Sequence, residues 1–318
     1  TWDMTSDTTQ SYYPFLPKDT YGAGKQMGAL VQYAHAAEAA AEASDHPFHR
    51  HQGKAQAEAA REAVGHMLRM WLAAPGTSKT PSDLSPPKGV TVPPEPYPFY
   101  YFAWEPHYRS MLGFPGSYGS TTALNDHHFH YGYFIGSAAW LATKNPAFIE
   151  EYGGMIDLLV ADVGCTERIQ QYLRKSQGDE APTFPIQRYF DVYEGHPYAT
   201  GFQVPSLPGP QNEAATEALN SWIGMVLWGR IAGRKEIEEA GIYLLSTHAA
   251  SIAEYCFNVG ADLTVDEAAC TVTATPDADG NIGNCRASFV NFSGSVPDAV
   301  LSKAKGGTPV SVELSNPG

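Results

Sequence analysis

Apolar residues recur at helical spacing in seven segments of the 318-residue chain, with polar residues between them. We predict helices over residues 22–44, 52–74, 131–143, 146–162, 166–176, 213–232 and 234–256. Stretches rich in proline, glycine and aromatic residues lie at 75–98, 99–125 and 177–212, and they predict long loops. Paired helices separated by such loops favour a helical toroid whose loops build a site on one face.

The pattern changes after Gly260. Threonine, valine, aspartate, glycine and serine dominate, helical spacing stops, and the runs CTVTAT, ASFVNF and TPVSVEL favour short β-strands. We therefore predict a mainly α chain, with a toroid-like helical domain over residues 1–260 and a β-rich or irregular tail over residues 261–318.

The charge balance narrows the class of partner. The chain has 20 Lys and Arg against 34 Asp and Glu, a formal net charge of −14. A nucleic acid requires a basic face, and no run of Lys and Arg supplies one, so we expect no nucleic-acid partner. An acidic surface tolerates a neutral substrate. No window of ~18 consecutive apolar residues occurs, so we expect no membrane span.

Several weak signals favour an extracellular protein. The first ten residues lack both the basic and the apolar region of a signal peptide, so we expect a processed start. No CxxC pair occurs among the four cysteines, but Cys270 and Cys285 flank a stretch rich in Asp and Gly that could close as a disulfide loop. Asn291 begins a glycosylation sequon. Together these features predict secretion.

The densest group of chemically active side chains is NDHHFHYGY, at residues 125–133, where a loop rich in Gly, Ser and Thr enters a helix. In one interpretation Asn125 or Asp126 caps the helix and the histidines pack against aromatic rings. In a second, His127 and His130 bind a metal at i,i+3 spacing. In a third, Asp126 is a catalytic carboxyl group whose protonation the neighbouring imidazoles control.

A second group lies at the start of the helix predicted over residues 213–232. Asn212 is a good helix cap, and Glu213 and Glu217 are four residues apart, hence on one helix face. Acidic residues are favoured in a first helical turn by the helix dipole, which explains them without any function. Alternatively, both carboxylates project into one cleft from the junction of loop and helix.

Between these groups, a Gly-His-Pro-Tyr turn at residues 195–198 lies among aromatic residues, which suits a ligand wall or plain loop packing. Two carboxyl groups on different helices, ringed by Tyr, Trp and His, suit glycoside hydrolysis. One protonates the leaving oxygen, and the other activates water or attacks the sugar. Aromatic rings stack on the apolar face of pyranose rings, and a neutral polysaccharide fits the acidic chain better than an anionic one.

Three ordered blocks resemble the catalytic region of glycoside hydrolase family 81, the endo-β-1,3-glucanases or laminarinases. They are STTALNDHHFHYGYFIGSAAWLA at 120–142, TFPIQRYFDVYEGHPYATGF at 183–202 and PQNEAATEALNSWIGMVLWG at 210–229. Weaker similarity appears at residues 21–34 and 158–163, and the resemblance covers roughly residues 20–255.

This resemblance implies an (α/α)6 toroidal catalytic domain and an inverting hydrolase of laminarin-type or callose-type glucan, without metal or cofactor. It makes Asp126 the general acid, Glu213 the general base and Glu217 a second, supporting carboxylate. The expected substrate contacts are Trp104, His128, His130, Tyr131, Tyr133, Asp191, Tyr193, His196 and Tyr198.

The chain also departs from the family pattern. Ala214, Ala215 and Thr216 replace the family's serines between the two glutamates, and Tyr198 replaces a tryptophan. The seven predicted helices are fewer than the twelve of a complete toroid. Either the toroid is incomplete, or further helices lie in the segments interpreted as loops, or this chain is part of a larger protein. Two alternatives therefore stand beside the glucanase: a non-catalytic glucan-binding remnant of the fold, and an (α/α) toroid hydrolase or lyase acting on another glycan.

Overall fold

A computed structural model describes residues 19–72, 100–200, 215–256, 263–266, 271–274 and 310–313. The chain divides into two compact units. The first comprises residues Thr1–Asp191 and Pro197–Leu245, and the second comprises Val192–His196 and Ser246–Gly318. No helix of the described residues is both long enough and apolar enough to cross a membrane.

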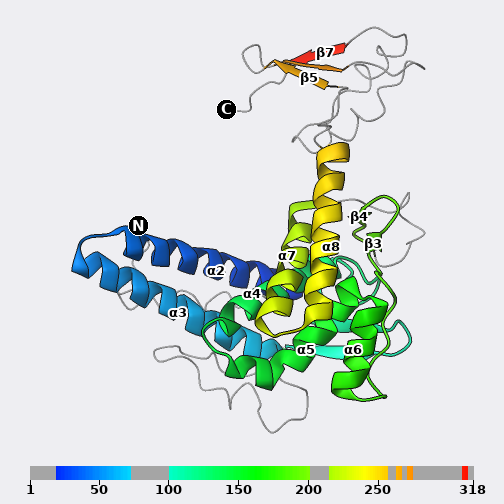
Figure 1. The fold of residues 1–318 in the computed structure, drawn as a ribbon, viewed down its shortest axis with the longest axis horizontal. Helices are drawn as coiled ribbons and strands as arrows, with labels where there is room; N and C mark the ends of the chain where they lie inside the picture. Colours follow the sequence, from blue (N-terminus) through cyan, green and yellow to red (C-terminus); the bar gives the residue numbers. More distant parts are fainter. Residues whose placement is uncertain are drawn as a thin grey trace. The chain divides into compact units, whose positions relative to one another are not determined.

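Seven α-helices in the described residues confirm the helical prediction, with bounds shifted by a few residues at most ends (Figure 1). They are α2 (Thr20–Ala43), α3 (Pro47–Leu72), α4 (His127–Ala142), α5 (Ala147–Gly164), α6 (Glu167–Gln177), α7 (Ala215–Ile231) and α8 (Lys235–Ser251), which continues as a π-helical turn, Ile252–Cys256. The starts differ most, since α3 begins five residues and α4 four residues before the expected positions.

The expectation of a loop over residues 99–125 is partly wrong, because the segment contains a β-hairpin. Strands β1 (Tyr101–Glu105) and β2 (Ser110–Phe114) pair antiparallel, with Tyr101 opposite Phe114 and Glu105 opposite Ser110. Glycine and aromatic residues concealed the strands, since neither strand alternates cleanly between apolar and polar residues.

Other strands are short. Strand β3 (Phe190–Asp191) belongs to the first unit. Strand β4 spans His196–Pro197, of which Pro197 belongs to the first unit and His196 to the second. The second unit contains an antiparallel sheet in the order β5-β6-β7, formed by Leu263–Asp266, Thr271–Ala274 and Val310–Glu313. Two of the predicted β-type runs, CTVTAT and TPVSVEL, are therefore confirmed, while ASFVNF lies outside the described residues.

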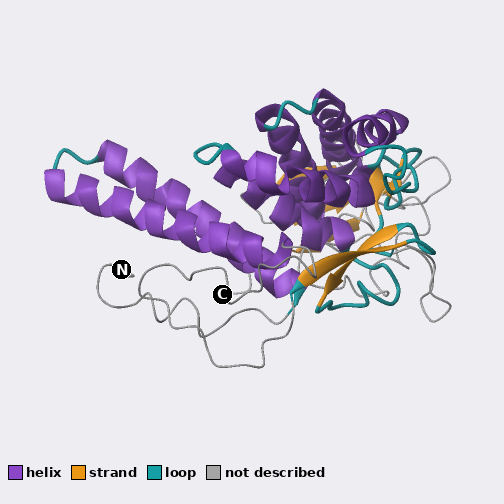
Figure 2. Cartoon of the chain, turned by 90° about the horizontal axis from the view of Figure 1, so that it is seen from below, coloured by secondary structure: helices purple, strands orange, loops and turns teal. Residues whose placement is uncertain are grey.

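Helix α4 is the centre of the first unit. Every residue of α4 except Tyr133 and Gly136 is buried, because α2, α5 and α7 all pack against it. Helices α2 and α3 form the long antiparallel pair at the left of Figures 1 and 2. The helix is apolar on nearly all sides, as expected for one that is surrounded by other helices.

Small residues bring α4 and α7 unusually close together. A Cβ added to Gly132 would lie 2.0 Å from Ser221 Oγ and 2.9 Å from its Cα, and one added to Gly224 would lie 3.0 Å from the Gly136 nitrogen. The hydroxyl of Ser221 also donates a hydrogen bond to the carbonyl of His128. The two backbones therefore pack directly on each other near the first turns of both helices.

Gly132→Ala should lower the free energy of unfolding by about 2 kcal/mol, because the new methyl group would force the α7 backbone outward. Gly136→Ala is the matched control, since its Cβ would meet only the Gly224 Cα at 3.9 Å. The control should be neutral or stabilising by up to ~1 kcal/mol through helix propensity. Urea unfolding of both variants tests this, and equal stabilities would contradict the close contact.

Candidate active site

Asp126 occupies the N-cap position of α4 with a left-handed backbone, φ 63° and ψ 12°. Its carbonyl accepts the first helical hydrogen bond from the His130 nitrogen at 2.9 Å, but its side chain makes no capping hydrogen bond. Asp126 is therefore the N-cap residue, as one interpretation of the sequence expected, although its side chain does not cap the helix. Its own nitrogen donates to the carbonyl of Ala199 at 2.7 Å, which fixes the turn.

His127 belongs to a buried polar network. Its Nδ1 lies 2.6 Å from Asp162 Oδ2, and its Nε2 lies 2.7 Å from the carbonyl oxygen of Ser120. The other oxygen of Asp162 accepts hydrogen bonds from the Ser110 hydroxyl and the Met111 nitrogen at 2.7 and 2.9 Å. Both ring nitrogens are occupied, so His127 ties β2, α4 and α5 together instead of binding a metal. Among the described residues, no group of three or more metal-ligating side chains is close enough to hold an ion.

His128 and Tyr131 are fully buried packing residues. The His128 ring lies 4.8 Å from the Tyr189 ring and nearly parallel to the Trp222 ring at 6.2 Å. The Tyr131 hydroxyl donates to the Met111 carbonyl at 2.8 Å and accepts from the Gly113 nitrogen at 3.1 Å. This agrees with the interpretation that the histidines pack against aromatic rings.

His130 is 1% exposed and lies behind the surface of the site. Its Nδ1 is 2.8 Å from the Thr20 hydroxyl, and its ring packs 5.1 Å from the Tyr21 ring. Burial, followed by repulsion from His127, lowers the pKa of His130 to about 3. The imidazole is therefore neutral, and it supports Tyr21.

Glu217, in the first turn of α7, receives hydrogen bonds from two other helices. Its Oε1 accepts from the Tyr133 hydroxyl of α4 at 2.7 Å, and from the Tyr21 hydroxyl and Lys25 Nζ of α2 at 3.0 and 3.1 Å. The carboxylate side chain is only 15% exposed. The hydrogen bond to Glu217 raises the pKa of Lys25, and burial, followed by the same carboxylate, raises the pKa of Tyr133.

Two glycines of α2 set the position of Tyr133. A Cβ on Gly24 would lie 3.0 Å from the Tyr133 Cβ, and one on Gly28 would lie 2.8 Å from its ring. The ring therefore lies flat across α2 with its hydroxyl directed to Glu217. Sequence reasoning missed Tyr21 and Lys25 as site residues, although their i,i+4 spacing in the segment YGAGK placed them on one helix face.

The first turns of α4 and α7 lie beside each other. Phe129 and Ala218 are buried in one small cluster with Ala199, whose carbonyl also holds the Asp126 nitrogen. Asp126 and Glu217 thus stand at the starts of neighbouring helices. Glu213 lies outside the described residues, as do Cys270, Cys285 and Asn291.

The remaining predicted substrate contacts differ in exposure. Trp104 is partly buried with its ring 4.9 Å from Phe184, and Asp191 and Tyr198 are half-buried. In the second unit, Tyr193 is 92% exposed and His196 is buried.

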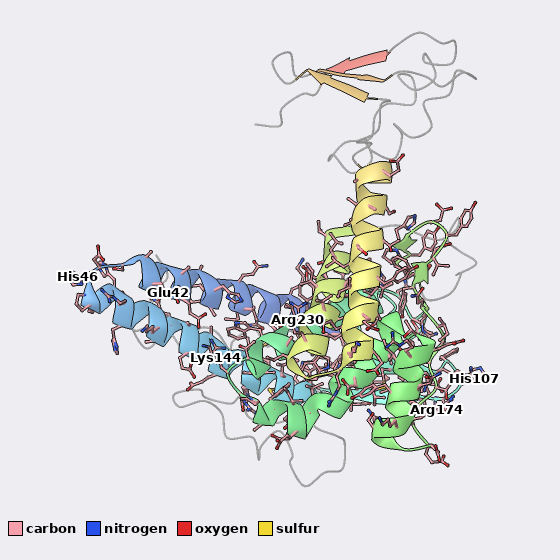
Figure 3. All side chains as sticks on the ribbon, viewed as in Figure 1. Glu42, His46, His107, Lys144, Arg174 and Arg230 are labelled. Carbon is pink, nitrogen blue, oxygen red and sulfur yellow. The ribbon has the colours of Figure 1, made fainter. Side chains whose placement is uncertain are left out.

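Two hollows adjoin the helices. Figure 3 labels Arg230 of the first, and Glu42 and Lys144 of the second. A mostly apolar groove of about 420 Å³ runs along α2, α4 and α7, lined by Tyr133 at one end and Arg230 at the other. A polar hollow of about 600 Å³ lies between α2, α3 and the end of α4, with Glu42 and Lys144 among its lining residues. Of these two hollows, only the apolar groove is lined by a residue, Tyr133, that donates a hydrogen bond to Glu217.

Comparison with known proteins agrees with the sequence motifs. The family model "Glycosyl hydrolase family 81 C-terminal domain" matches residues 114–271. A glucan endo-1,3-beta-D-glucosidase of Acetivibrio thermocellus is 36% identical over 167 residues, which are 52% of this chain and 20% of that protein. One from Thermobifida fusca is 30% identical over 246 residues, 77% of this chain and 27% of that protein.

A solved structure, a mutant of a glycoside hydrolase family 81 protein from Clostridium thermocellum, matches 81% of this chain and 31% of its own length. The TM-score is 0.56 and the sequence identity is 27%. The chain thus spans between a fifth and a third of the length of these relatives.

The stability of the protein should decrease as the pH falls from 6.5 toward 3. The folded state resists protonation of His130 (pKa about 3), whereas an unfolded histidine takes up a proton near pH 6.5. Above pH 6.5 His130 is neutral in both states and does not affect stability, and about 3 kcal/mol of stability should be lost by pH 4.5. Urea unfolding at pH 7 and 4.5 should show a smaller loss in His130→Asn. The control His49→Asn, at an exposed site, should lose as much stability as the wild type between the two pH values. If His130→Asn also loses as much as the wild type, His130 is not the source of the pH dependence.

Proposed function

Because this chain belongs to glycoside hydrolase family 81 through residues 114–271, we propose that it is an endo-acting hydrolase of β-1,3-glucan. The observation that carries the proposal is the pair of carboxylates at the starts of the adjacent helices α4 and α7. The Asp126 side chain does not serve as a cap, and Glu217 is held by three donors from α2 and α4. Neither carboxylate is explained by helix formation alone.

Asp126 acts as the general acid and Glu213 as the general base of an inverting mechanism. Asp126 donates a proton to the glycosidic oxygen as the bond from that oxygen to the anomeric carbon breaks. Glu213 takes a proton from a water molecule whose oxygen forms the new bond on the opposite face. Inversion requires ~6.5–9.5 Å between the two carboxyl groups, enough to hold the water.

Glu217 supports this reaction but does not act as the base. Three donors converge on its Oε1, so that oxygen has no room to accept a proton from water. Its Oε2 has only a longer contact with Tyr21, 3.3 Å, and can accept a hydrogen bond from a sugar hydroxyl. We therefore assign Glu217 to substrate support and Glu213 to the base, an order that the two glutamine variants test.

A secreted or extracellular location follows from this substrate. A polymeric glucan is cleaved where it lies, and one relative is a primary septum glucan endo-1,3-beta-D-glucosidase of Schizosaccharomyces pombe. The net charge of −14 suits a neutral polysaccharide in laminarin or callose.

The second candidate is a glucan-binding remnant without turnover. The altered residues between the two glutamates favour it, since Ala214, Ala215 and Thr216 stand where the family has serines. Proton NMR of the protein with laminarin separates the two candidates. Early appearance of α-anomeric product establishes inverting hydrolysis, while saturable binding without product establishes the remnant.

Asp126→Asn should reduce glucan cleavage by about 10²–10⁴-fold, because an amide cannot donate the catalytic proton. Asparagine tolerates the left-handed backbone of this position, so the fold should be retained. Reducing-sugar release and circular dichroism measure the two effects. Near-normal turnover in this variant would remove Asp126 from the role of acid.

Glu213→Gln should reduce kcat more than Glu217→Gln, because only the first removes the base. Tyr133→Phe should reproduce part of the Glu217→Gln defect, about tenfold, through loss of one hydrogen bond to a charged group. Tyr172→Phe is the matched control, since it removes a tyrosine–carboxylate bond to Asp157 on α5. The reverse order of the two glutamate variants would exchange their roles.

A further inference from the structure

Tyr118 combines an exposed aromatic ring with an unfavourable backbone. The side chain is 68% exposed, and its φ of 51° lies in the left-handed region, where a bulky residue is uncommon. Gly119 follows at φ 77°, so two successive residues are left-handed. A glycine or asparagine would satisfy the first position without strain. A strained and largely exposed aromatic residue gains little from the fold beyond edge contacts with Tyr21 and His130, which points to a role outside folding.

Hydrogen bonds hold this turn against the start of α2. The Ser117 hydroxyl donates to Asp19 Oδ1 at 3.1 Å, and Asp19 caps α2 through the Gly22 nitrogen at 2.8 Å. The Ser117 nitrogen donates to the Ser120 hydroxyl at 3.2 Å. The turn that carries Tyr118 is therefore fixed to the helix that carries Tyr21.

The Tyr118 ring stands edge-on to the Tyr21 ring. The ring centres are 5.3 Å apart and the planes meet at 85°. The Tyr21 ring packs on His130, and its hydroxyl donates to Glu217 Oε1 at 3.0 Å. One aromatic ring thus separates Tyr118 from the carboxylate of Glu217, and the T-shaped contact holds the Tyr118 ring while it remains exposed.

We propose that Tyr118 is a sugar-binding platform on which a glucose unit of a β-glucan stacks, one ring beyond Glu217. The inference rests on the proposed function, which supplies the neutral polysaccharide. In β-linked glucose the hydroxyl groups are equatorial, so the axial C–H groups form an apolar face. That face fits the electron-rich face of a tyrosine ring, and the ring is fixed before the sugar arrives.

The strain at Tyr118 gives the proposal a distinctive test, because folding and binding should respond in opposite directions. Tyr118→Asn removes the ring and suits the left-handed backbone. It should raise the Tm by about 2 °C and weaken the Kd for laminaripentaose by about tenfold, equivalent to ~1.4 kcal/mol. Tyr118→Phe keeps the ring face and should bind as the wild type. Calorimetric titration and thermal unfolding of the whole chain provide the two measurements.

Tyr108→Asn is the matched control, since it removes an exposed tyrosine from the turn between β1 and β2. It should leave the Kd unchanged. Wild-type affinity in Tyr118→Asn would overturn the platform while leaving the proposed function intact. Equal losses in Tyr118→Phe and Tyr118→Asn would show that the hydroxyl, and not the ring face, makes the contact, which also overturns stacking. Failure of the wild type to bind or cleave any laminari-oligosaccharide would instead overturn the proposed function, and the platform with it.

Discussion

The close approach of α4 to its neighbours is the constraint on which the site depends. Gly132 and Ser221 let the α4 and α7 backbones pack directly, while Gly24 and Gly28 let α2 approach until Tyr133 lies flat across it. Each contact occupies space that a side chain would otherwise fill, so the helices approach closely at the site. Tyr133 of α4 can then reach Glu217 of α7 with a 2.7 Å hydrogen bond. A helix bundle spaced by ordinary side chains, 8–10 Å between axes, would leave these groups farther apart.

The packing around α4 also determines what His127, His128 and His130 can do. His127 faces Asp162 and uses both ring nitrogens to hold the hairpin and α5 in place. His128 fills space between aromatic rings, and His130 remains neutral behind Tyr21. Buried polar side chains are stable only when they are hydrogen-bonded, and His127 satisfies that requirement through groups that also position β2. The three histidines therefore hold the first turn of α4, at whose start Asp126 stands.

Sequence reasoning found the helices because their apolar spacing reflects burial, and it selected Asp126 and Glu217 as candidates because they belong to distinctive motifs. It missed the hairpin, since Gly113 and the aromatic residues of β1 and β2 hide the alternation of a strand. It also missed Lys25, Tyr21 and Tyr118. Lys25 is nearly 200 residues from its partner Glu217, and only the three-dimensional packing of α2 joins them. The left-handed backbone of Tyr118 could not be predicted from the sequence either, because tyrosine rarely adopts that conformation.

Strain and hydrogen bonding act together at the loop before α4. Tyr118, Leu124 and Asp126 all have left-handed backbones within nine residues. Such residues cost stability, and they persist only where surrounding contacts determine them. Here Asp19 holds the turn at Ser117, the carbonyl of Ala199 holds Asp126, and Tyr189 donates to the Leu124 carbonyl at 2.8 Å. The loop is therefore a rigid support rather than a flexible connection. A rigid loop suits the proposed hydrolysis, because the acid would already be in position when the glucan binds. The stability lost in these three backbones is offset by the buried core around α4, whose packing holds every anchor of the loop in place.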